Sequence, residues 1–260
     1  MSDAVRYEAH DRIGVITLDR PDNRNSMTPE LLDAFAHASA TARADGSIRA
    51  LIVTGTGNCF SAGADFKAGL QRGDDALPPH ERSYAMYEAF LSLLDVEVPI
   101  IGALNGNAVG GGFGLALVCD LRIGAREAKY GANFTRLGLA PGMSISYLLP
   151  RLIGIARASE LLFTGRLVDG DEAERIGLLS RAVPAADVLP AALTLARTIA
   201  DNAPFAVRET KRAIRRGLAL EVRDAARAEA HAQAASLAMD DAREGIAALL
   251  EKRAPKFTGR

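Results

Sequence analysis

An alternation of short apolar runs with stretches of helical spacing restricts the fold of this chain more than any other feature. Three runs are apolar and short, as expected of strands buried on both faces: 49–54, 99–104 and 121–125. Stretches with helical spacing flank and separate them: 29–45, 84–94 and a third that begins in the glycines at 110–112. Because strands that alternate with helices form sheets covered by helices, the pattern predicts an α/β fold.

The two ends of the chain differ in pattern. Apolar residues alternate on both sides of Asp11-Arg12, which predicts a β-hairpin over residues 5–18. From Asp187 onward the spacing is helical, in four segments: 187–200, 204–217, 221–238 and 240–253. We therefore expect a core over residues 1–186 and a helical region over residues 187–260 that serves oligomerisation.

Charge and apolar content exclude several classes of protein. With 31 Lys+Arg against 32 Asp+Glu, the chain lacks the excess positive charge that binds nucleic acid non-specifically. Its longest apolar runs, such as 98–104, are far shorter than the roughly 20 residues of a membrane-spanning helix. No secretory signal is visible, and two cysteines do not make a disulfide framework. We expect a cytoplasmic protein with no nucleic-acid or membrane partner.

Common cofactor and nucleophile motifs are missing from the sequence. The glycine-rich stretch 110–114 is followed by Leu115 and Leu117, where the third glycine of a dinucleotide-binding motif would fall. No phosphate-binding GxxxxGK occurs, and the four histidines make no cluster with metal-ligand spacing. Ser144 lacks the second glycine of a nucleophile elbow. The sequence therefore predicts no resident cofactor and no metal.

Two glycine-containing turns remain as candidates for chemistry. One is 61–65 and the other is 105–114, and each lies between a predicted strand end and a predicted helix start. Small residues there let a ligand approach the backbone, and amide N–H groups at a helix N-terminus favour negative charge. Two such amides that converge on one point would make an oxyanion hole. The alternative is that these glycines only permit tight turns and close packing.

Several longer motifs occur along nearly the whole chain. They are, in order, Arg20-Pro21 to Asn25-Ser26-Met27, Ile52 to Gly55, Phe60 to Lys67, Pro99 to Gly106, Val109 to Gly112, Cys119-Asp120, Gly138 with Pro141-Gly142, Gly177 to Leu179, Val183-Pro184, and Glu251 to Phe257. Together these motifs resemble the crotonase (enoyl-CoA hydratase/isomerase) family, and their order and spacing match as well.

The resemblance implies a fold, an assembly and a chemistry. Members of the family fold as a spiral of repeated ββα units followed by a helical trimerisation region, and they assemble as trimers or dimers of trimers. The implied substrate is an acyl-CoA thioester of fatty acid metabolism, with coenzyme A as part of the substrate. Two backbone amides polarise the thioester carbonyl, and by motif position these amides belong to Ala64 and Gly111.

The resemblance also assigns contacts with coenzyme A. Four residues fall on positions that line the coenzyme A channel: Arg24, Ser26, Ala62 and Lys67. Lys256 and Phe257 belong to a C-terminal segment that in the family can reach the coenzyme A of a neighbouring subunit. For the charged side chains, a solvated surface position is the alternative.

Two positions depart from the family pattern. Hydratases of the family activate water with two glutamates, and here those positions hold Gly114 and Phe134. Because neither side chain transfers a proton, the assignment as an enoyl-CoA hydratase is nominal. The alternatives are an enoyl-CoA isomerase, an acyl-CoA hydrolase and a non-catalytic acyl-CoA-binding protein.

Other proton carriers must come from elsewhere in the chain. His80, Glu81 and Tyr84 lie on the segment that in the family helps to enclose the acyl group, and they are the candidates. Solvated loop residues, with a tyrosine that serves packing, are the alternative. Phe134, beside Phe113, Leu137, Leu139 and Met143, predicts an apolar acyl end of the pocket.

Overall fold

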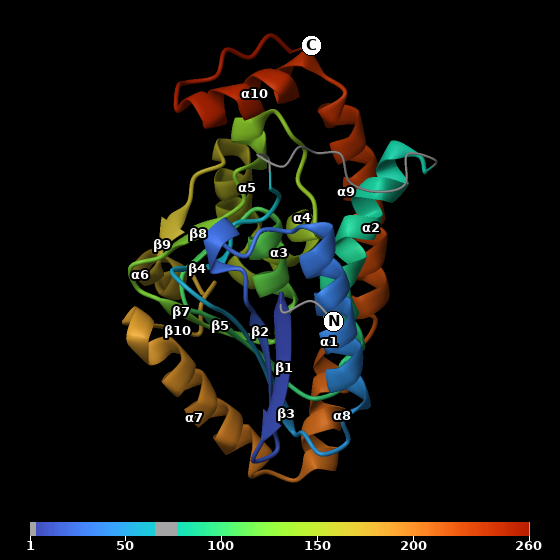
Figure 1. The fold of residues 1–260 in the computed structure, drawn as a ribbon, viewed down its shortest axis with the longest axis vertical. Helices are drawn as coiled ribbons and strands as arrows, with labels where there is room; N and C mark the ends of the chain where they lie inside the picture. The colour runs from blue at the N-terminus through green and yellow to red at the C-terminus, as the bar shows by residue number, and fades with distance from the viewer. Residues whose placement is uncertain (1–3, 66–76, 260) are drawn as a thin grey trace.

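Two β-sheets form the centre of the protein over the part of the chain that the structure describes, residues 4–65 and 77–259 (Figure 1). The structure is a computed structural model. The large sheet has the strand order β1 (Val5–His10), β2 (Ile13–Leu18), β3 (Ala50–Gly55), β5 (Ile100–Leu104), β7 (Leu121–Ala125) and β10 (Arg181–Val183). The small sheet has the order β4 (Cys59–Ser61), β6 (Asn107–Val109), β8 (Lys129–Gly131) and β9 (Val168–Asp169).

Successive strands contribute to different sheets. Each of the pairs β3 and β4, β5 and β6, and β7 and β8 gives its first strand to the large sheet and its second to the small sheet. A helix follows each of the first two pairs: α2 (Pro79–Leu91) and α3 (Gly111–Val118). The hairpin of β1 and β2 is antiparallel, and the rest of the large sheet is parallel. The prediction of an α/β spiral of ββα units is confirmed.

The first long helix shows how local sequence sets an element. Helix α1 (Pro29–Ala44) begins where Thr28-Pro29 predicts it, and the Thr28 hydroxyl accepts a hydrogen bond from the Leu31 N–H at 3.2 Å. Its buried face, which includes Leu31 and Phe35, packs on β1, β2 and α2. Helix α2 begins at Pro79, earlier than the predicted Tyr84, because proline suits the first position of a helix.

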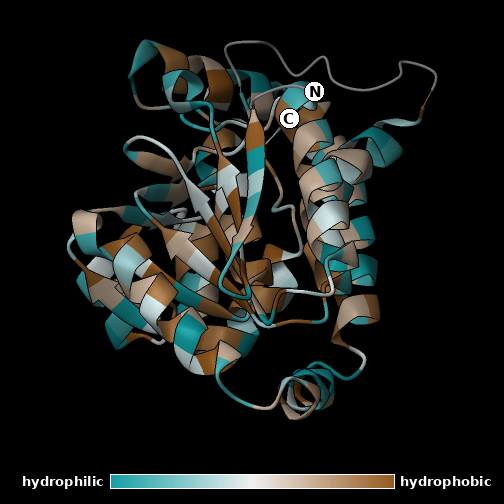
Figure 2. Ribbon diagram, turned by 60° about the horizontal axis from the view of Figure 1, so that its bottom comes forward, coloured by the Kyte–Doolittle hydropathy of each residue, from teal (hydrophilic) through white to brown (hydrophobic). Residues whose placement is uncertain are grey.

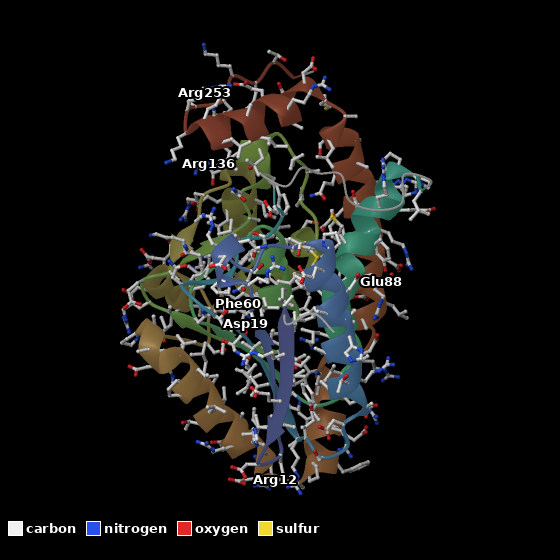
Figure 3. All side chains as sticks on the ribbon, viewed as in Figure 1. Arg12, Asp19, Phe60, Glu88, Arg136 and Arg253 are labelled. Carbon is white, nitrogen blue, oxygen red and sulfur yellow. The ribbon has the colours of Figure 1, made fainter. Side chains whose placement is uncertain are left out.

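The C-terminal helices cover the core. They are α7 (Val188–Ala200), α8 (Pro204–Ile214), α9 (Leu218–Leu237) and α10 (Asp240–Glu251), close to the predicted segments. Helix α7 packs on β3, β5 and β7, whereas α9 runs along α2. Helix α10 lies at one end of the long axis, against the 3-10 helix η3 (Phe134–Leu137) (Figure 1). Figure 3 shows Arg253 at this end and Arg12 at the other, with the fully buried Phe60 between them.

Helix α3 is buried along its whole length, in all eight of its residues. Figure 2 shows hydrophobic segments gathered toward the middle of the protein. The polar backbone of α3 is therefore available to solvent or ligand only at its ends. The remaining helices are α4 (Ile145–Ile153), α5 (Ile155–Thr164) and α6 (Gly170–Arg175). Helix α4 packs on α3, α5 and α9.

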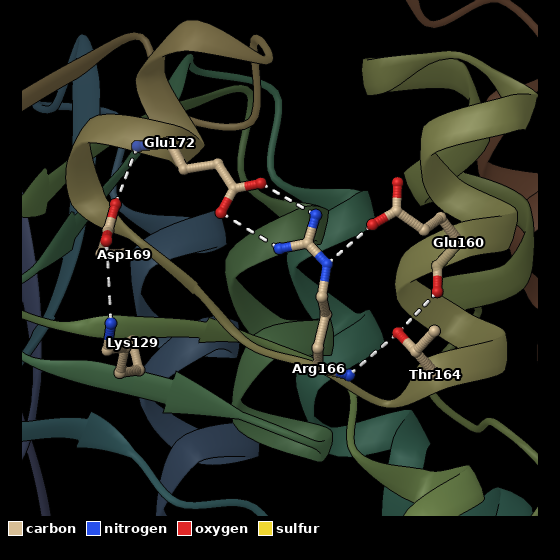
Figure 4. A network of polar contacts seen from close by, with 6 residues as sticks. All are labelled: Lys129, Glu160, Thr164, Arg166, Asp169 and Glu172. Atoms are coloured by element: carbon tan, nitrogen blue, oxygen red, sulfur yellow. Dashed lines mark hydrogen bonds and ion pairs between the residues drawn. The ribbon is translucent and has the colours of Figure 1, made fainter.

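A polar network ties α5 and α6 together at the surface (Figure 4). The guanidinium of Arg166 makes two hydrogen bonds to the Glu172 carboxylate, at 2.9 and 3.1 Å, and a third to Glu160 at 2.8 Å. The Asp169 side chain caps α6 by accepting from the Glu172 N–H, and pairs with Lys129 of β8. Because the planar guanidinium satisfies two carboxylates at once, the network fixes the connection between these helices.

Candidate active site

The N-terminus of α3 is built from glycine. Gly110 precedes the helix with φ +57° and ψ −124°, a conformation that side chains disfavour. The first N–H groups of a helix have no acceptor within the helix, and the helix dipole makes this end positive. Because α3 is buried along its whole length, its positive N-terminal end lies inside the protein, where it favours a negatively charged group.

A second glycine turn touches this helix end. A Cβ added to Gly63, whose φ is +76°, would lie 2.7 Å from the Val109 carbonyl oxygen and 2.9 Å from the Gly111 nitrogen. Only glycine fits this contact. Ala64 follows Gly63 directly, so the structure brings the turns of Ala64 and Gly111 together. The role of their amides stays a prediction.

Main-chain hydrogen bonds hold this turn to the loop before α1. Ala64 forms an isolated parallel β-bridge with Met27, and the Met27 N–H donates to the Gly63 carbonyl at 2.8 Å. The Ala62 N–H donates to the Arg24 carbonyl at 3.0 Å. The Ser26 hydroxyl is buried and donates to the Asn23 carbonyl, whereas the Arg24 side chain is exposed.

Asn25 is a buried residue of this loop whose side-chain role the sequence analysis missed. Its amide oxygen accepts from the Arg20 N–H at 2.8 Å, and its amide nitrogen donates to the carbonyls of Thr56 and Cys59. Its own carbonyl accepts from the Ser61 hydroxyl. With φ at +52°, asparagine is one of the few residues that tolerate this backbone conformation. Asn25 therefore joins the loop before α1 to residues 56–61, which lead into the turn at Gly63.

Three apolar side chains lie near the start of α3. A Cβ at Gly111 would overlap the sulfur of Met27, and a Cβ at Gly110 would lie 3.9 Å from Cζ of Phe134. A Cβ at Gly114 would overlap Cβ of Met143 and lie 3.0 Å from its Cγ. The two positions without the family glutamates thus lie in apolar surroundings, and the space beside Gly114 is filled by Met143.

The predicted proton carriers lie on α2. The His80 ring stacks on the His231 ring of α9, with centroids 3.9 Å apart, and Glu81 is exposed. Both belong to the first turn of α2 rather than to a loop. The Tyr84 hydroxyl is buried and has no hydrogen-bond partner among the described residues. Their role as proton carriers stays a prediction.

Helix α9 contributes buried polar groups that sequence reasoning did not single out. Glu229 is only 6% exposed and accepts hydrogen bonds from the N–H and the hydroxyl of Ser146. Burial raises the pKa of the Glu229 carboxyl, although these hydrogen bonds oppose the shift. Gln233 accepts from the Tyr87 hydroxyl and donates to the Ala140 carbonyl. The sequence signal for these groups is that Glu229 and Gln233 are spaced by four residues on the helix face that points to the core.

The C-terminal segment is folded back on α10. The Glu244 carboxylate binds the Arg253 guanidinium and accepts from the Lys256 N–H at 2.8 Å, and these bonds lower the pKa of Glu244 to about 2. The Asp241 carboxylate accepts from the Thr258 N–H. The side chains of Lys256 and Phe257 are exposed. Lys67, the remaining predicted contact with coenzyme A, lies outside the described residues.

Metal-binding clusters and membrane-spanning helices are both absent from residues 4–65 and 77–259. No group of three or more His, Cys, Asp or Glu side chains there is arranged to hold a metal ion. No helix in those ranges is long and apolar enough to cross a membrane.

Comparisons with known proteins agree with one another. The family model described as enoyl-CoA hydratase/isomerase matches residues 8–260. A Mycobacterium leprae protein named "Probable enoyl-CoA hydratase echA8" is 38% identical over 262 residues, which cover 99% of each chain. The crystal structure of an enoyl-CoA hydratase/isomerase from Pseudoalteromonas atlantica has a TM-score of 0.87 at 32% identity, covering 98% of this chain and 100% of that one. A carnitinyl-CoA hydratase from Mycobacterium avium gives 0.85 at 31% identity and covers each chain fully.

Proposed function

Because this chain belongs to the enoyl-CoA hydratase/isomerase family, we propose that it binds an acyl-CoA thioester and polarises its carbonyl with the N–H groups of Ala64 and Gly111. The single observation that carries the proposal is the contact between Gly63 and Gly111, which puts the two turns that contain these amides side by side. Two donors aimed at one oxygen stabilise the negative charge that develops on an enolate or a tetrahedral intermediate.

The apolar surroundings strengthen this effect. Met27, Phe134 and Met143 line the start of α3, so few water molecules compete for the amides. A hydrogen bond to a developing charge is worth more in such a low-dielectric site than in water. The proposed chemistry uses no resident cofactor and no metal.

Hydration of an enoyl-CoA is the nominal reaction. Isomerisation and thioester hydrolysis are the alternatives, and each would use the same anion site. A second candidate function is acyl-CoA binding without turnover. The observation that favours it is Met143, which fills the space where a side chain at position 114 would stand. With Phe134 at the other position, neither usual carboxylate is present to move a proton.

For coenzyme A we propose contacts from both ends of the chain. The exposed guanidinium of Arg24 suits a phosphate, while Ser26 and Ala62 shape the loop beside it. Lys67 is proposed from the sequence alone. Lys256 and Phe257 are exposed and held on α10, which supports a contact with the coenzyme A of a neighbouring subunit in a trimer or a dimer of trimers. The cytoplasm is the proposed compartment.

The first experiment follows the absorbance of the conjugated thioester when protein is added to crotonyl-CoA and to a longer trans-2-enoyl-CoA, with binding measured by calorimetry. Rapid loss of absorbance supports hydration. Binding without loss withdraws the hydratase reaction and leaves isomerisation, hydrolysis or simple binding. No binding of either thioester contradicts the proposed function as a whole.

The oxyanion assignment has its own test. A proline at position 111 removes the N–H but its ring would overlap Met27, so Gly111→Pro is made together with Met27→Ala and compared with Met27→Ala alone. We expect loss of about 100-fold or more in turnover, or of the near-ultraviolet enolate absorbance of bound acetoacetyl-CoA, which needs no proton carrier from the protein. Equal signals from the two variants would refute the assignment.

A further inference from the structure

The segment between η3 and α4 holds a strained backbone. Met143 and Ser144 are consecutive residues with side chains, and both have left-handed φ values, +64° and +58°. Side chains disfavour this region because Cβ approaches the following carbonyl. Such strain persists only where surrounding contacts impose it, and it concentrates at functional sites.

Helix α9 supplies those contacts. The Ser144 hydroxyl donates to the Val222 carbonyl at 2.7 Å, and the Ser146 N–H donates to the Glu229 carboxylate at 2.8 Å. At the other end of the segment, the Ala140 N–H donates to the Ser236 hydroxyl at 3.0 Å. Ser144 makes no side-chain cap for α4, so Glu229 supplies the negative group that this helix N-terminus favours.

The strained segment places one side chain at the candidate active site. Met143 lies against Gly114, where an added Cβ would be 3.4 Å from its terminal methyl carbon and closer still to its Cβ and Cγ. Gly114 follows Gly111 by three residues, so both lie on the same face of α3, about 4.5 Å apart along the axis. A thioester whose oxygen is held at Gly111 would therefore extend its next carbons toward Met143.

We propose that Met143 sets the size and shape of the acyl group that the site accepts, and that Glu229 is the positioning residue that holds Met143 in place. The proposal rests on acyl-CoA binding as the proposed function. It gives a helix of the C-terminal third a part in substrate selection.

Burial of the Glu229 carboxylate costs folding free energy, which points to a role beyond stability. It is the one buried carboxylate among residues 4–65 and 77–259, and its Oε2 has no hydrogen-bond partner there. A buried polar atom without a partner opposes folding. Since Glu229 bonds to Ser146, three residues after Met143, rather than to the start of α3, it acts through Met143 and not on substrate.

The test compares how tightly variants bind butyryl-CoA and octanoyl-CoA, two saturated thioesters that undergo no hydration. Calorimetry gives the ratio of the two dissociation constants for wild type, Met143→Ala, Glu229→Ala and Glu229→Gln. The matched control is Glu221→Gln, because Glu221 is also on α9 and accepts from Tyr147 of α4, but it is exposed and outside the segment.

We expect Met143→Ala to shift the ratio toward octanoyl-CoA by about tenfold, the effect of space for about two more methylenes. Glu229→Ala should shift the ratio in the same direction, and Glu229→Gln less, because its amide oxygen can still accept from Ser146. The control should leave it unchanged. In Met143→Ala/Glu229→Ala, the second change should add little to the first, because Glu229 acts through Met143.

Each contrary outcome has a distinct meaning. An unchanged ratio in Met143→Ala would overturn the role of Met143. A lower melting temperature in both Glu229 variants with the wild-type ratio would make Glu229 purely structural and overturn its role. If Glu229→Ala does not fold, Glu229→Gln and Ser146→Ala, which removes one hydrogen bond, decide the point. Failure of wild type to bind either thioester would instead contradict the proposed function.

Discussion

The ammonium group of Lys211 lies 2.9 Å from the carboxylate of Asp120, and this ion pair joins α8 to the turn that follows α3. Arg215 binds the other carboxylate oxygen at 2.6 Å, and the Ile100 N–H donates to the same group at 2.7 Å. Burial lowers the pKa of Lys211, and the Asp120 carboxylate opposes that shift. Asp120 therefore anchors the C-terminal helices to the core.

Replacement of Asp120 should strongly destabilise the protein. Asp120→Asn leaves the buried ammonium of Lys211 and the guanidinium of Arg215 without their carboxylate partner, and an unpaired buried charge costs about 3–5 kcal/mol. The control is Glu97→Gln, because Glu97 forms an exposed pair with Arg212 on the same helix and should cost about 1 kcal/mol or less. Urea unfolding followed by circular dichroism measures both, and equal effects would contradict a special role for Asp120.

A glutamate at position 114 should need a smaller residue at position 143. Gly114→Glu alone forces its Cβ into Met143, and overpacking of this kind costs about 1–3 kcal/mol. Gly114→Glu/Met143→Gly removes the overlap, and glycine relaxes the left-handed backbone at 143. We expect the double variant to be more stable than Gly114→Glu in thermal unfolding. If Gly114→Glu is as stable as wild type, the Met143 side chain moves aside at little cost, which would contradict the prediction.

The C-terminal segment should detach from α10 in acid. The pKa of Glu244 is about 2 in the folded chain because it binds Arg253 and the Lys256 N–H, and it is about 4.5 when these contacts are lost. The stabilisation is therefore complete above about pH 4.5 and disappears as pH falls toward 2. Hydrogen exchange of residues 256–259, normalised for the intrinsic rate, should accelerate over this range.

The same exchange experiment separates Glu244 from other acidic groups of α10. Glu244→Gln should show fast exchange of the tail already at pH 7. Asp240→Asn is the control, since Asp240 pairs only with Arg243 of its own helix in the described contacts. Equal exchange in the two variants would mean that Glu244 does not hold the tail.

Both thiols should resist alkylation in the folded protein. Cys59 and Cys119 are buried, and burial raises the pKa of Cys59 to about 11 and that of Cys119 to about 12. Little reactive thiolate is then present at pH 8. Mass spectrometry after iodoacetamide treatment should find neither residue modified until urea is added. Modification at the rate of free cysteine would indicate frequent local opening.

Elements with a local signal could be predicted from the sequence. Thr28-Pro29 marks the start of α1, and the glycines at 110–112 mark the start of α3. Most strands of the small sheet were not predicted, because segments of two or three residues, such as Val168–Asp169, are too short to show a period. Pairing with neighbours, rather than local preference, makes them strands.

The candidate site divides in the same way. The two glycine turns at Ala64 and Gly111 carry a local signal and were predicted. The contact of Met143 with Gly114 and that of Glu229 with Ser146 join residues far apart in the chain. A single sequence does not reveal such pairs. Taken alone, Met143 has the pattern of any core methionine, and Glu229 has that of any glutamate on a helix.

The loop before α1 and the turn at Gly63 are joined by bonds between main-chain atoms, from Met27 to Gly63 and from Ala62 to Arg24. Such bonds do not depend on which side chains are present, so they remain when a mutation removes a catalytic carboxylate. The ability to hold an anion and the identity of the reaction can thus be inherited separately. A descendant can exchange one reaction for another while the turns that we propose to bind the thioester stay the same.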